Sequence, residues 1–419
     1  MKYKIYTLGC KVNEYESEVM ENLLDAAGYE KSDDPDICII NTCTVTNQAD
    51  SKSRKLIRSV KRNNPDALII AVGCMIQNKI DTLEEMDIDI ALGNKDKSKI
   101  VSYIENYKDK TSAIYDIEQM EFEDMSLSNS DLTRAYIKIQ DGCDNYCAFC
   151  VIPYVRGHVR CKKFDKVIEE AKHLIVNGHK EIVLTGIHTG NYHDNTYDLS
   201  DLLARLSKLD GLERLRISSI EITELNDKFL QTLNNSKVLT NHMHIPLQSG
   251  SDRVLKTMNR KYDVKYFIDK INKIRNIRPG MNITTDVIVG FPGETDEMFM
   301  ETIETIKTIG FSKLHVFPYS KREGTKAAAM KNQINGNIKK ERVRTLIDLS
   351  KELEIKYMNK FLNLDTSFIP ETYDKGYLYG HTENFLFVKV KGEKALLGKC
   401  VNIKTKDIVY PYMLADLTH

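Results

Sequence analysis

The sequence has no net charge and no long hydrophobic run, and each absence excludes a class of protein. Its 60 Lys and Arg residues balance 60 Asp and Glu residues, so a nucleic-acid partner would have to be held by local basic patches. No apolar run approaches the roughly 18 to 20 residues that a membrane-spanning helix requires. Residues 1–10 lack the charged and apolar regions of a secretory signal peptide. We therefore expect a cytoplasmic protein without membrane contact.

Internal repeats and low-complexity segments are also absent, so the chain is expected to fold as ordinary globular domains. Its 419 residues suggest two or three of them. Nine cysteines in a reducing compartment are expected to be metal ligands, catalytic thiols or small buried hydrophobes and not a disulfide framework. Their positions decide between these roles.

The first hundred residues predict a parallel α/β sheet domain. Short apolar strands alternate with helical stretches, the strands at residues 2–9, 36–43 and 67–74 and the helices at 17–27 and 53–61. Each strand ends at or just before a cysteine, namely Cys10, Cys43 and Cys74. Because functional groups of parallel sheets collect at the carboxyl ends of the strands, we expect the three thiols to converge on one edge.

The rest of the chain predicts a linker and two further domains. Residues 116–131 carry six acidic residues and no basic one, as is typical of a linker. Six strand candidates then alternate with helices, the pattern of a partial or complete parallel (β/α) barrel, followed by a basic helix at 338–362. Short alternating runs after residue 364 predict a small antiparallel β-barrel. The expected domains are residues 1–115, 132–355 and 356–419, with 116–131 as the linker.

A CxxxCxxC pattern follows the first strand candidate of the second domain. In DGCDNYCAFC the cysteines are Cys143, Cys147 and Cys150. Three thiolates on one tight loop can bind three irons of a [4Fe–4S] cluster and leave the fourth iron open for a small chelating ligand. A zinc loop is the alternative, with His158 or Cys161 as a further ligand.

This motif resembles that of the radical S-adenosylmethionine enzymes, in which the methionine part of the cofactor chelates the open iron. Three later segments resemble cofactor-binding stretches of that family, in the same chain order: LTG at 184–186, SSIE at 218–221 and DVIVGFPGET at 286–295. The resemblance implies cofactor contacts from five residues: Phe149, Gly186, Ser218, Glu221 and Val289. For Phe149, ordinary core packing explains the residue equally well.

The segments around the amino-terminal cysteines resemble one particular branch of these enzymes. A lone cysteine at a strand end is more often a buried hydrophobe, but LGCKVNEYES, NTCTVTNQADSKSR and VGCMIQ closely resemble the amino-terminal domain of the methylthiotransferases. In that family three such cysteines hold a second [4Fe–4S] cluster, so the resemblance implies that Cys10, Cys43 and Cys74 hold one here, where a sulfur atom can be kept. The remaining cysteines match no ligand position and are interpreted as structural thiols: Cys38, Cys161 and Cys400.

Two features predict contact with RNA. The stretch SKSRKLIRSVKRNN has no acidic residue, and its Leu56, Ile57 and Val60 can face the core of a helix while the basic side is free for phosphates. The candidate RNA-binding residues are Arg54, Lys55, Arg58, Lys61 and Arg62. A solvated helix face is the alternative interpretation. Near the carboxyl terminus, HTENFLFVKVKG resembles the TRAM domain, a small RNA-binding barrel, with Tyr377 and Phe385 as expected exposed aromatics.

The loop sequences resemble those of one branch of the methylthiotransferases. GCKVNEYE, IPYVRG and LTGIHTGNY are most similar to the bacterial tRNA threonylcarbamoyladenosine methylthiotransferases. That similarity implies insertion of a methylthio group at C2 of N6-threonylcarbamoyladenosine beside the tRNA anticodon. The alternatives are N6-isopentenyladenosine in tRNA, an aspartate of a ribosomal protein, or a noncatalytic iron-sulfur RNA-binding protein. The last would not need intact LTG, SSIE and VIVGFPGE segments.

The resemblance also implies cofactors and partners. Side-chain acids and bases cannot place sulfur on an unactivated aromatic carbon, so a cofactor must carry that step. The implied cofactors are two [4Fe–4S] clusters and S-adenosylmethionine, which donates a methyl group and is cleaved to a radical. The implied partners are a tRNA anticodon loop, an electron donor such as flavodoxin or ferredoxin, and a sulfur donor. No side chain is assigned as catalytic, although Arg156, His244 and Gln248 are further candidates for the site.

Overall fold

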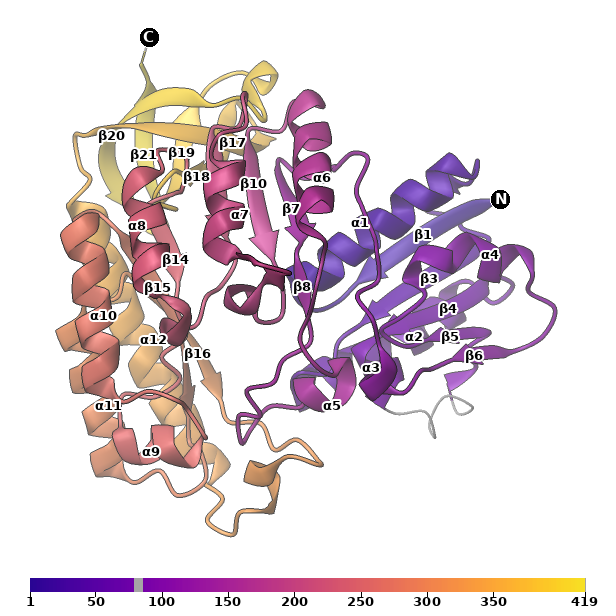
Figure 1. The fold of residues 1–419 in the computed structure, drawn as a ribbon, viewed down its shortest axis with the longest axis horizontal. Coiled ribbons are helices and arrows are strands. Elements are labelled where there is room, and N and C mark those ends of the chain that lie inside the picture. The colour runs from indigo at the N-terminus through magenta and orange to yellow at the C-terminus, as the bar shows by residue number, and fades with distance from the viewer. Residues whose placement is uncertain (79–85, 419) are drawn as a thin grey trace.

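Parallel strands dominate the first three quarters of the chain (Figure 1), as the alternating pattern predicts. The computed structural model describes residues 1–78 and 86–418. Among the helices of these two ranges, none has both the length and the apolar composition that crossing a membrane would require.

The amino-terminal domain contains a six-stranded parallel sheet in the order β2-β1-β3-β4-β5-β6. The three predicted strands are present, as β1 (Lys2–Thr7), β3 (Ile37–Thr42) and β4 (Leu68–Gly73). The other strands of the sheet are β2 (Glu30–Lys31), β5 (Ile90–Leu92) and β6 (Thr111–Ala113). The helices are α1 (Lys11–Ala26), α2 (Asn47–Asn63), α3 (Cys74–Asn78) and α4 (Ile100–Glu105).

Helices cover both faces of this sheet, which explains why its central strands read as continuous apolar runs. In β3, Cys38 and Ile40 face the core that α2 and α3 complete. Ile37 and Ile39 point to the opposite face, where α1 and α4 pack. Every residue of β3 is buried.

Six further parallel strands form an open barrel in chain order. β7 (Arg134–Lys138), β10 (Glu181–Thr185) and β13 (Arg214–Ile217) form one sheet. β14 (His242–His244), β15 (Asn282–Val289) and β16 (Lys313–Pro318) form a second. An isolated parallel bridge pairs Leu215 of β13 with Leu239, three residues before β14. Within the described residues β7 and β16 do not pair, so the barrel is the partial one of the two predicted forms.

Helices surround the outside of this barrel (Figure 1). The longer ones are α6 (Phe164–Val176), α7 (Leu199–Leu206), α8 (Asp227–Asn235), α10 (Val264–Ile277), α11 (Asp296–Ile309) and α12 (Gly336–Asn359). Two short helices, α5 (Ile152–Arg156) and α9 (Asp252–Thr257), lie in loops. In α8 the buried residues are Phe229, Leu230 and Leu233, at the spacing of one helix face.

The C-terminal strands close into a five-stranded barrel in the order β17-β18-β19-β21-β20. They are β17 (Asp365–Asp374), β18 (Tyr377–Thr382), β19 (Phe387–Lys391), β20 (Val401–Val409) and β21 (Tyr412–Leu417). Four pairs are antiparallel as predicted, but β19 and β21 pair in parallel. β21 runs in the same direction as β19 because the β20–β21 hairpin reverses the chain, and their pairing completes the barrel.

The acidic segment 116–131 is held against both neighbouring domains. The hydroxyl of Tyr15 in α1 donates to the carbonyl of Met125 at 2.6 Å. The backbone N–H of Leu127 donates to Glu170 of α6 at 2.8 Å, and the Ser130 hydroxyl donates to Glu18 at 2.7 Å. Its backbone is therefore fixed between α1 and α6, with Met125 and Leu127 in the core.

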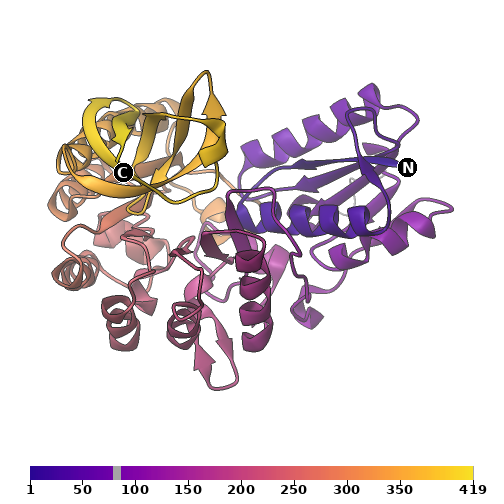
Figure 2. The ribbon, with the colours of Figure 1, turned by 90° about the horizontal axis from the view of Figure 1, so that it is seen from above.

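The C-terminal barrel lies at the amino ends of the central strands (Figures 1 and 2). Buried arginines attach it there. Glu181, fully buried at the start of β10, pairs with Arg216 at 2.7 Å and with Arg214 at 3.4 Å. Arg214 donates to the carbonyl of His381 at 3.1 Å, and Arg216 donates to that of Glu383 at 3.1 Å. Burial alone would raise the pKa of Glu181, but the two arginines lower it.

Replacing Glu181 by Gln is therefore expected to lower the free energy of unfolding by about 3–5 kcal/mol, because it leaves buried guanidinium charge without its carboxylate. The control is Glu213→Gln, which breaks the exposed pair with Lys180 and should change stability by about 0–1 kcal/mol. Urea unfolding at neutral pH measures both. Equal effects of the two substitutions would contradict the role of Glu181 in docking.

Candidate functional site

The carboxyl ends of three adjacent strands bring Cys10, Cys43 and Cys74 to one edge of the amino-terminal sheet. β1, β3 and β4 are neighbours, and each thiol follows its strand by one to three residues. The chain at Gly9 passes so close that an added Cβ would lie 3.1 Å from the Cβ of Cys43, and its φ of +125° favours glycine. Burial raises the pKa of Cys43 to about 11 and also raises that of Cys10.

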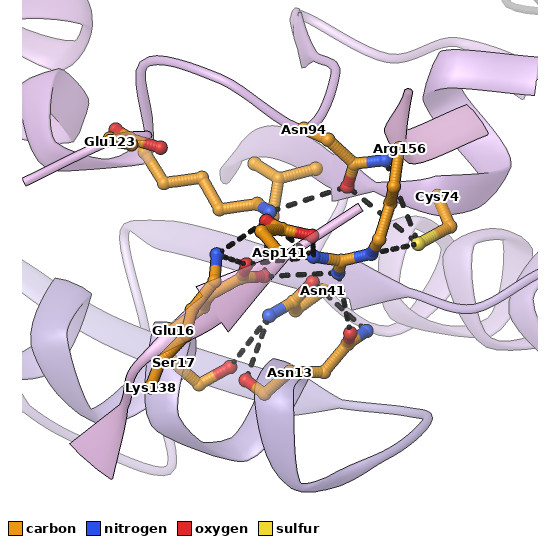
Figure 3. Close-up of polar contacts among 12 residues, drawn as sticks. Asn13, Glu16, Ser17, Asn41, Cys74, Asn94, Glu123, Lys138, Asp141 and Arg156 are labelled. Atoms are coloured by element: carbon orange, nitrogen blue, oxygen red, sulfur yellow. Dashed lines mark hydrogen bonds and ion pairs between the residues drawn. The ribbon is translucent and has the colours of Figure 1, made fainter. Parts of the chain in front are cut away.

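A buried ion-pair network lies next to this edge (Figure 3). Glu16 of α1 pairs with Lys97, Lys138 and Arg156 at 2.6, 2.7 and 3.2 Å, and all four side chains are at most 2% exposed. Burial alone would raise the pKa of Glu16, but the three cations together lower it. A carboxylate so surrounded stays ionised in the core.

Arg156 connects this network to the thiols. Its Nε donates to the Sγ of Cys74 at 3.2 Å, and its Nη1 donates to both carboxylate oxygens of Asp141 at 3.0 Å (Figure 3). Asp141 also pairs with Lys138 at 2.7 Å and stands two residues before Cys143. The network therefore joins the amino-terminal cysteines to the loop that carries the other three.

That loop begins at a glycine that no other residue could replace without a clash. Gly142 has a φ of +73°, and an added Cβ would lie 1.9 Å from the carbonyl oxygen of His158. The loop then closes when the N–H of Cys143 donates to the carbonyl of Gly157 at 3.0 Å. β8 (Gln140–Asp141) and β9 (Arg160–Cys161) pair beside it.

A second buried arginine, Arg260, donates a hydrogen bond to a thiol of this loop. The Nη1 of Arg260 donates to the Sγ of Cys147 at 3.2 Å, and its Nη2 pairs with Glu221. Burial raises the pKa of Cys147 while Arg260 lowers it, and burial raises the pKa of Cys150 to about 12. Thiols in such surroundings become thiolates when a metal binds them.

The donor sets suit iron-sulfur clusters. Each group offers three thiols, and in each group a buried arginine donates to one sulfur, as outer hydrogen bonds to cluster ligands do. A closed zinc site would require four ligands around a single ion, and each group here offers three thiols. His158 pairs instead with Asp144 and Glu118.

Two of the predicted cofactor-binding residues line a cavity, and one lies beside the cysteine loop. Gly186 and Ser218 line the cavity at the ends of β10 and β13. Glu221 reaches Cys147 through its ion pair with Arg260.

The other two, Phe149 and Val289, take part in packing. Phe149 contacts Phe291 edge to face, with ring centroids 6.5 Å apart, immediately before Cys150. Val289 is fully buried in the barrel core, so its side chain is occupied by apolar neighbours.

The cavity has a volume of about 720 Å³ and is lined by all three domains. The amino-terminal domain contributes Cys10 and Lys11, the barrel contributes His244, Asp286 and His315 among others, and the C-terminal barrel contributes Phe385 and Phe387. A thiol of the first cysteine group therefore faces the same space as the interior of the central barrel.

Cations on the cavity wall are paired, with one exception. Arg134 pairs with Glu371 at 3.1 Å, Arg216 with Glu181, and Lys313 with Glu354 at 3.0 Å. Within the described part of the chain, Lys11 makes no ion pair and no side-chain hydrogen bond, although it follows Cys10 directly. Its ammonium is the charge on this wall that is open to a ligand.

The candidate RNA-binding residues lie along α2, with Ile57 and Val60 buried beneath them as expected. The helix begins at the cysteine edge and runs away from it. At 1.5 Å per residue, the last turn is about 20 Å from the first. The terminal members Arg58, Lys61 and Arg62 are thus remote from the thiols, and Lys61 pairs with Asp87. Lys55, Arg58 and Arg62 are exposed, whereas Arg54 and Lys61 are half-buried.

The expectation that Phe385 is an exposed aromatic is wrong. Its ring stacks between His242 and His381, with centroids 4.5 and 4.2 Å away, and the guanidinium of Arg216 lies 4.7 Å from its centroid. Tertiary contact with the central barrel covers it. Tyr377 is 38% exposed, as expected, and lies under Lys389.

Five residues beside the thiols were not predicted from the sequence: Arg260, Glu16, Lys97, Lys138 and Asp141. Isolated charges carry no motif, and their burial depends on partners far along the chain. Of the further candidates, Arg156 belongs to the network, while His244 lies in the cavity wall with its Nδ1 3.0 Å from the hydroxyl of Thr284.

Known sequence families match both cysteine regions. The family described as "Radical SAM superfamily" matches residues 137–306, and the "Uncharacterized protein family UPF0004" matches residues 2–93. Among solved structures, the fold is similar to the radical S-adenosylmethionine methyltransferase TsrM from Kitasatospora setae, with a TM-score of 0.56 at 12% identity over 76% of this chain and 72% of that one. At that identity the likeness shows the fold alone.

Curated relatives match almost the whole chain. "Threonylcarbamoyladenosine tRNA methylthiotransferase MtaB" of Bacillus subtilis is 44% identical over 97% of this chain and 94% of its own length. The protein of that name from Thermotoga maritima is 37% identical over 97% and 94%. The "tRNA-2-methylthio-N(6)-dimethylallyladenosine synthase" of Finegoldia magna is 31% identical over 97% and 92%. The chain belongs to the methylthiotransferase family of radical S-adenosylmethionine enzymes.

Proposed function

We propose that this protein inserts a methylthio group at C2 of N6-threonylcarbamoyladenosine beside the anticodon of tRNA. The observation that carries the proposal is the near full-length similarity to relatives named for this modification, which exceeds the similarity to the relative named for dimethylallyladenosine. Dimethylallyladenosine, also called isopentenyladenosine, is the alternative substrate. The shared cavity, with Cys10 on one wall and the barrel interior on the other, supports the same conclusion.

When bound, S-adenosylmethionine and a cluster at Cys143, Cys147 and Cys150 supply the radical chemistry, and a cluster at Cys10, Cys43 and Cys74 supplies the place for sulfur. Cys10, Gly186 and Ser218 line one cavity, so the chain places a thiol of the amino-terminal group beside the proposed cofactor wall. Gly186 and Ser218 supply the wall for the cofactor, and Phe149, Glu221 and Val289 shape its surroundings. An unpaired base of the anticodon loop can enter at moderate cost.

Lys11 supports the threonylcarbamoyl substrate over the isopentenyl one. A threonylcarbamoyl group ends in a carboxylate, whereas an isopentenyl group is apolar and uncharged. The open ammonium of Lys11 in the cavity suits the carboxylate, whereas an apolar isopentenyl group would offer it no partner.

The remaining partners follow from the chemistry. Phosphates of tRNA are proposed to contact Lys55, Arg58 and Arg62, with Arg54 and Lys61 as half-buried support. Tyr377 and Lys389 on the C-terminal barrel offer a further stacking surface. Reductive cleavage of the cofactor requires an electron donor of the flavodoxin or ferredoxin class, and the inserted atom requires a sulfur donor.

Nucleoside analysis tests the function directly. Mass spectrometry of digested tRNA from cells with and without the gene should show loss of the 2-methylthio derivative and accumulation of its threonylcarbamoyl precursor. If the threonylcarbamoyl nucleosides are unchanged and the methylthio isopentenyl derivative is lost instead, the substrate is N6-isopentenyladenosine.

Substitutions of the cysteines should separate the two clusters. Cys147→Ala is expected to abolish formation of 5′-deoxyadenosine, because it removes a thiol of the radical cluster. Cys43→Ala should leave cofactor cleavage but remove sulfur insertion. The matched control is Cys400→Ala, a half-buried thiol on the C-terminal barrel that should keep both reactions. Retained methylthiolation in Cys43→Ala would contradict the second cluster.

Substitution of Lys11 should alter substrate selection. Lys11→Gln is expected to raise KM for a threonylcarbamoylated anticodon stem-loop by about 10- to 100-fold with little change in kcat, since a charge-assisted hydrogen bond contributes about 1.5–3 kcal/mol. Lys11→Arg should largely preserve KM. Iron content checks that Cys10 still binds its cluster.

The same substrate as a carboxylate methyl ester provides the control. The ester should weaken binding to the wild type by a similar factor and leave binding to Lys11→Gln almost unchanged. Equal penalties for the ester in both proteins would show that Lys11 does not bind the carboxylate.

A further inference from the structure

The site of the amino-terminal cysteines is completed by a residue from another domain. Arg156 lies on α5, in the loop that follows Cys150, yet its Nε donates to the Sγ of Cys74 at 3.2 Å. The two segments are held together by a second bond, in which the side-chain amide of Asn94 donates to the carbonyl of Val155 at 2.8 Å. Asn94 itself lies 3.7 Å from the same sulfur.

The guanidinium is fixed in orientation by its other bonds. Nη1 donates to Asp141 at 3.0 Å and to Glu16 at 3.2 Å, and Nη2 donates to the side-chain oxygen of Asn13 at 3.2 Å. Each nitrogen of the planar group thus has its own acceptor, and the Nε–H is left for sulfur (Figure 3). A lysine could not satisfy these positions together, because its single ammonium lacks the rigid fork.

The charges of the network are complementary to an anionic sulfur. Three buried cations, Lys97, Lys138 and Arg156, face two buried carboxylates, Glu16 and Asp141. The group therefore carries one positive charge in excess beside Cys74, and the partly exposed Arg160 adds to it through Asp141. Excess buried charge is costly unless an anion compensates it, and a cluster held by thiolates is such an anion.

We propose that Arg156 is a positioning residue that completes the cluster site of Cys10, Cys43 and Cys74 from the neighbouring domain and raises the reduction potential of the cluster held there. The inference rests on the proposed function only for the presence of that cluster. Hydrogen bonds and positive charge at a cluster sulfur stabilise the reduced, more negative form. Arg156 supplies both to Cys74.

Arg260 provides a matched comparison within the same chain. It donates to Cys147 at 3.2 Å, the same distance at which Arg156 meets Cys74, and it too is held by a carboxylate, Glu221. Each group of thiols therefore has its own arginine, and each arginine is expected to act on its own cluster.

The test is a redox titration of each cluster alone, followed by electron paramagnetic resonance. Arg156→Gln, Arg156→Lys and Arg260→Gln are placed in two backgrounds of the full-length chain. In one, Ala replaces Cys143, Cys147 and Cys150; in the other, Ala replaces Cys10, Cys43 and Cys74. Arg156→Gln should shift the midpoint potential of the amino-terminal cluster to more negative values, and Arg156→Lys should shift it less. Arg260→Gln should shift only the other cluster.

An unshifted amino-terminal cluster in Arg156→Lys and Arg156→Gln would overturn the proposal, as would equal shifts of both clusters by one substitution. If Arg156→Gln does not fold, Arg156→Lys decides the result alone, because it keeps the buried charge. The titration uses no tRNA, so the expected shifts, found together with a wild-type protein that shows no methylthiolation activity, would refute the proposed function and leave this inference intact.

Discussion

The carboxyl ends of parallel strands are the constraint on which this site depends. Two separate parallel sheets each deliver three thiols at such an end, one through β1, β3 and β4 and the other through the loop after β7 and β8. The buried pairs of Glu16 with Lys138 and Arg156 then fix one sheet edge against the other. Those ion pairs act together with the bond between Asn94 and Val155 and with the contacts of segment 116–131 in holding the two domains together.

Much of this arrangement could be predicted because it is local in sequence. Buried strands of a parallel sheet read as apolar runs, and a cysteine directly after such a run must lie at the sheet edge. CxxxCxxC requires only that one loop be tight, which Gly142 ensures. The helix ends were less predictable: α1 starts at Lys11, directly after Cys10, although its first apolar contacts suggested a later start.

The features that could not be predicted depend on contacts between segments that are distant in the sequence. Lys97, Glu16 and Lys138 look like solvated charges in the sequence, and only their convergence makes them a core network. Phe385 was expected in solvent for the same reason, since its position between His242 and His381 arises only when the C-terminal barrel docks. The direction of α2 likewise follows from the sheet: a crossover helix must run back along the strands, which carries Arg58 and Arg62 away from the thiols.

The shared network also explains why the two cysteine sites occur on one rigid assembly. Arg156 and Asp141 flank the same cysteine loop, one on each side, and both meet partners that contact α1. A displacement of that loop would leave Glu16 with fewer cations and Cys74 without its donor, so two buried charges would lose compensation together. The energetic cost of separating the sites is therefore cooperative. A reaction that needs two groups at one substrate gains from such a constraint, because the fold then sets the distance between the groups.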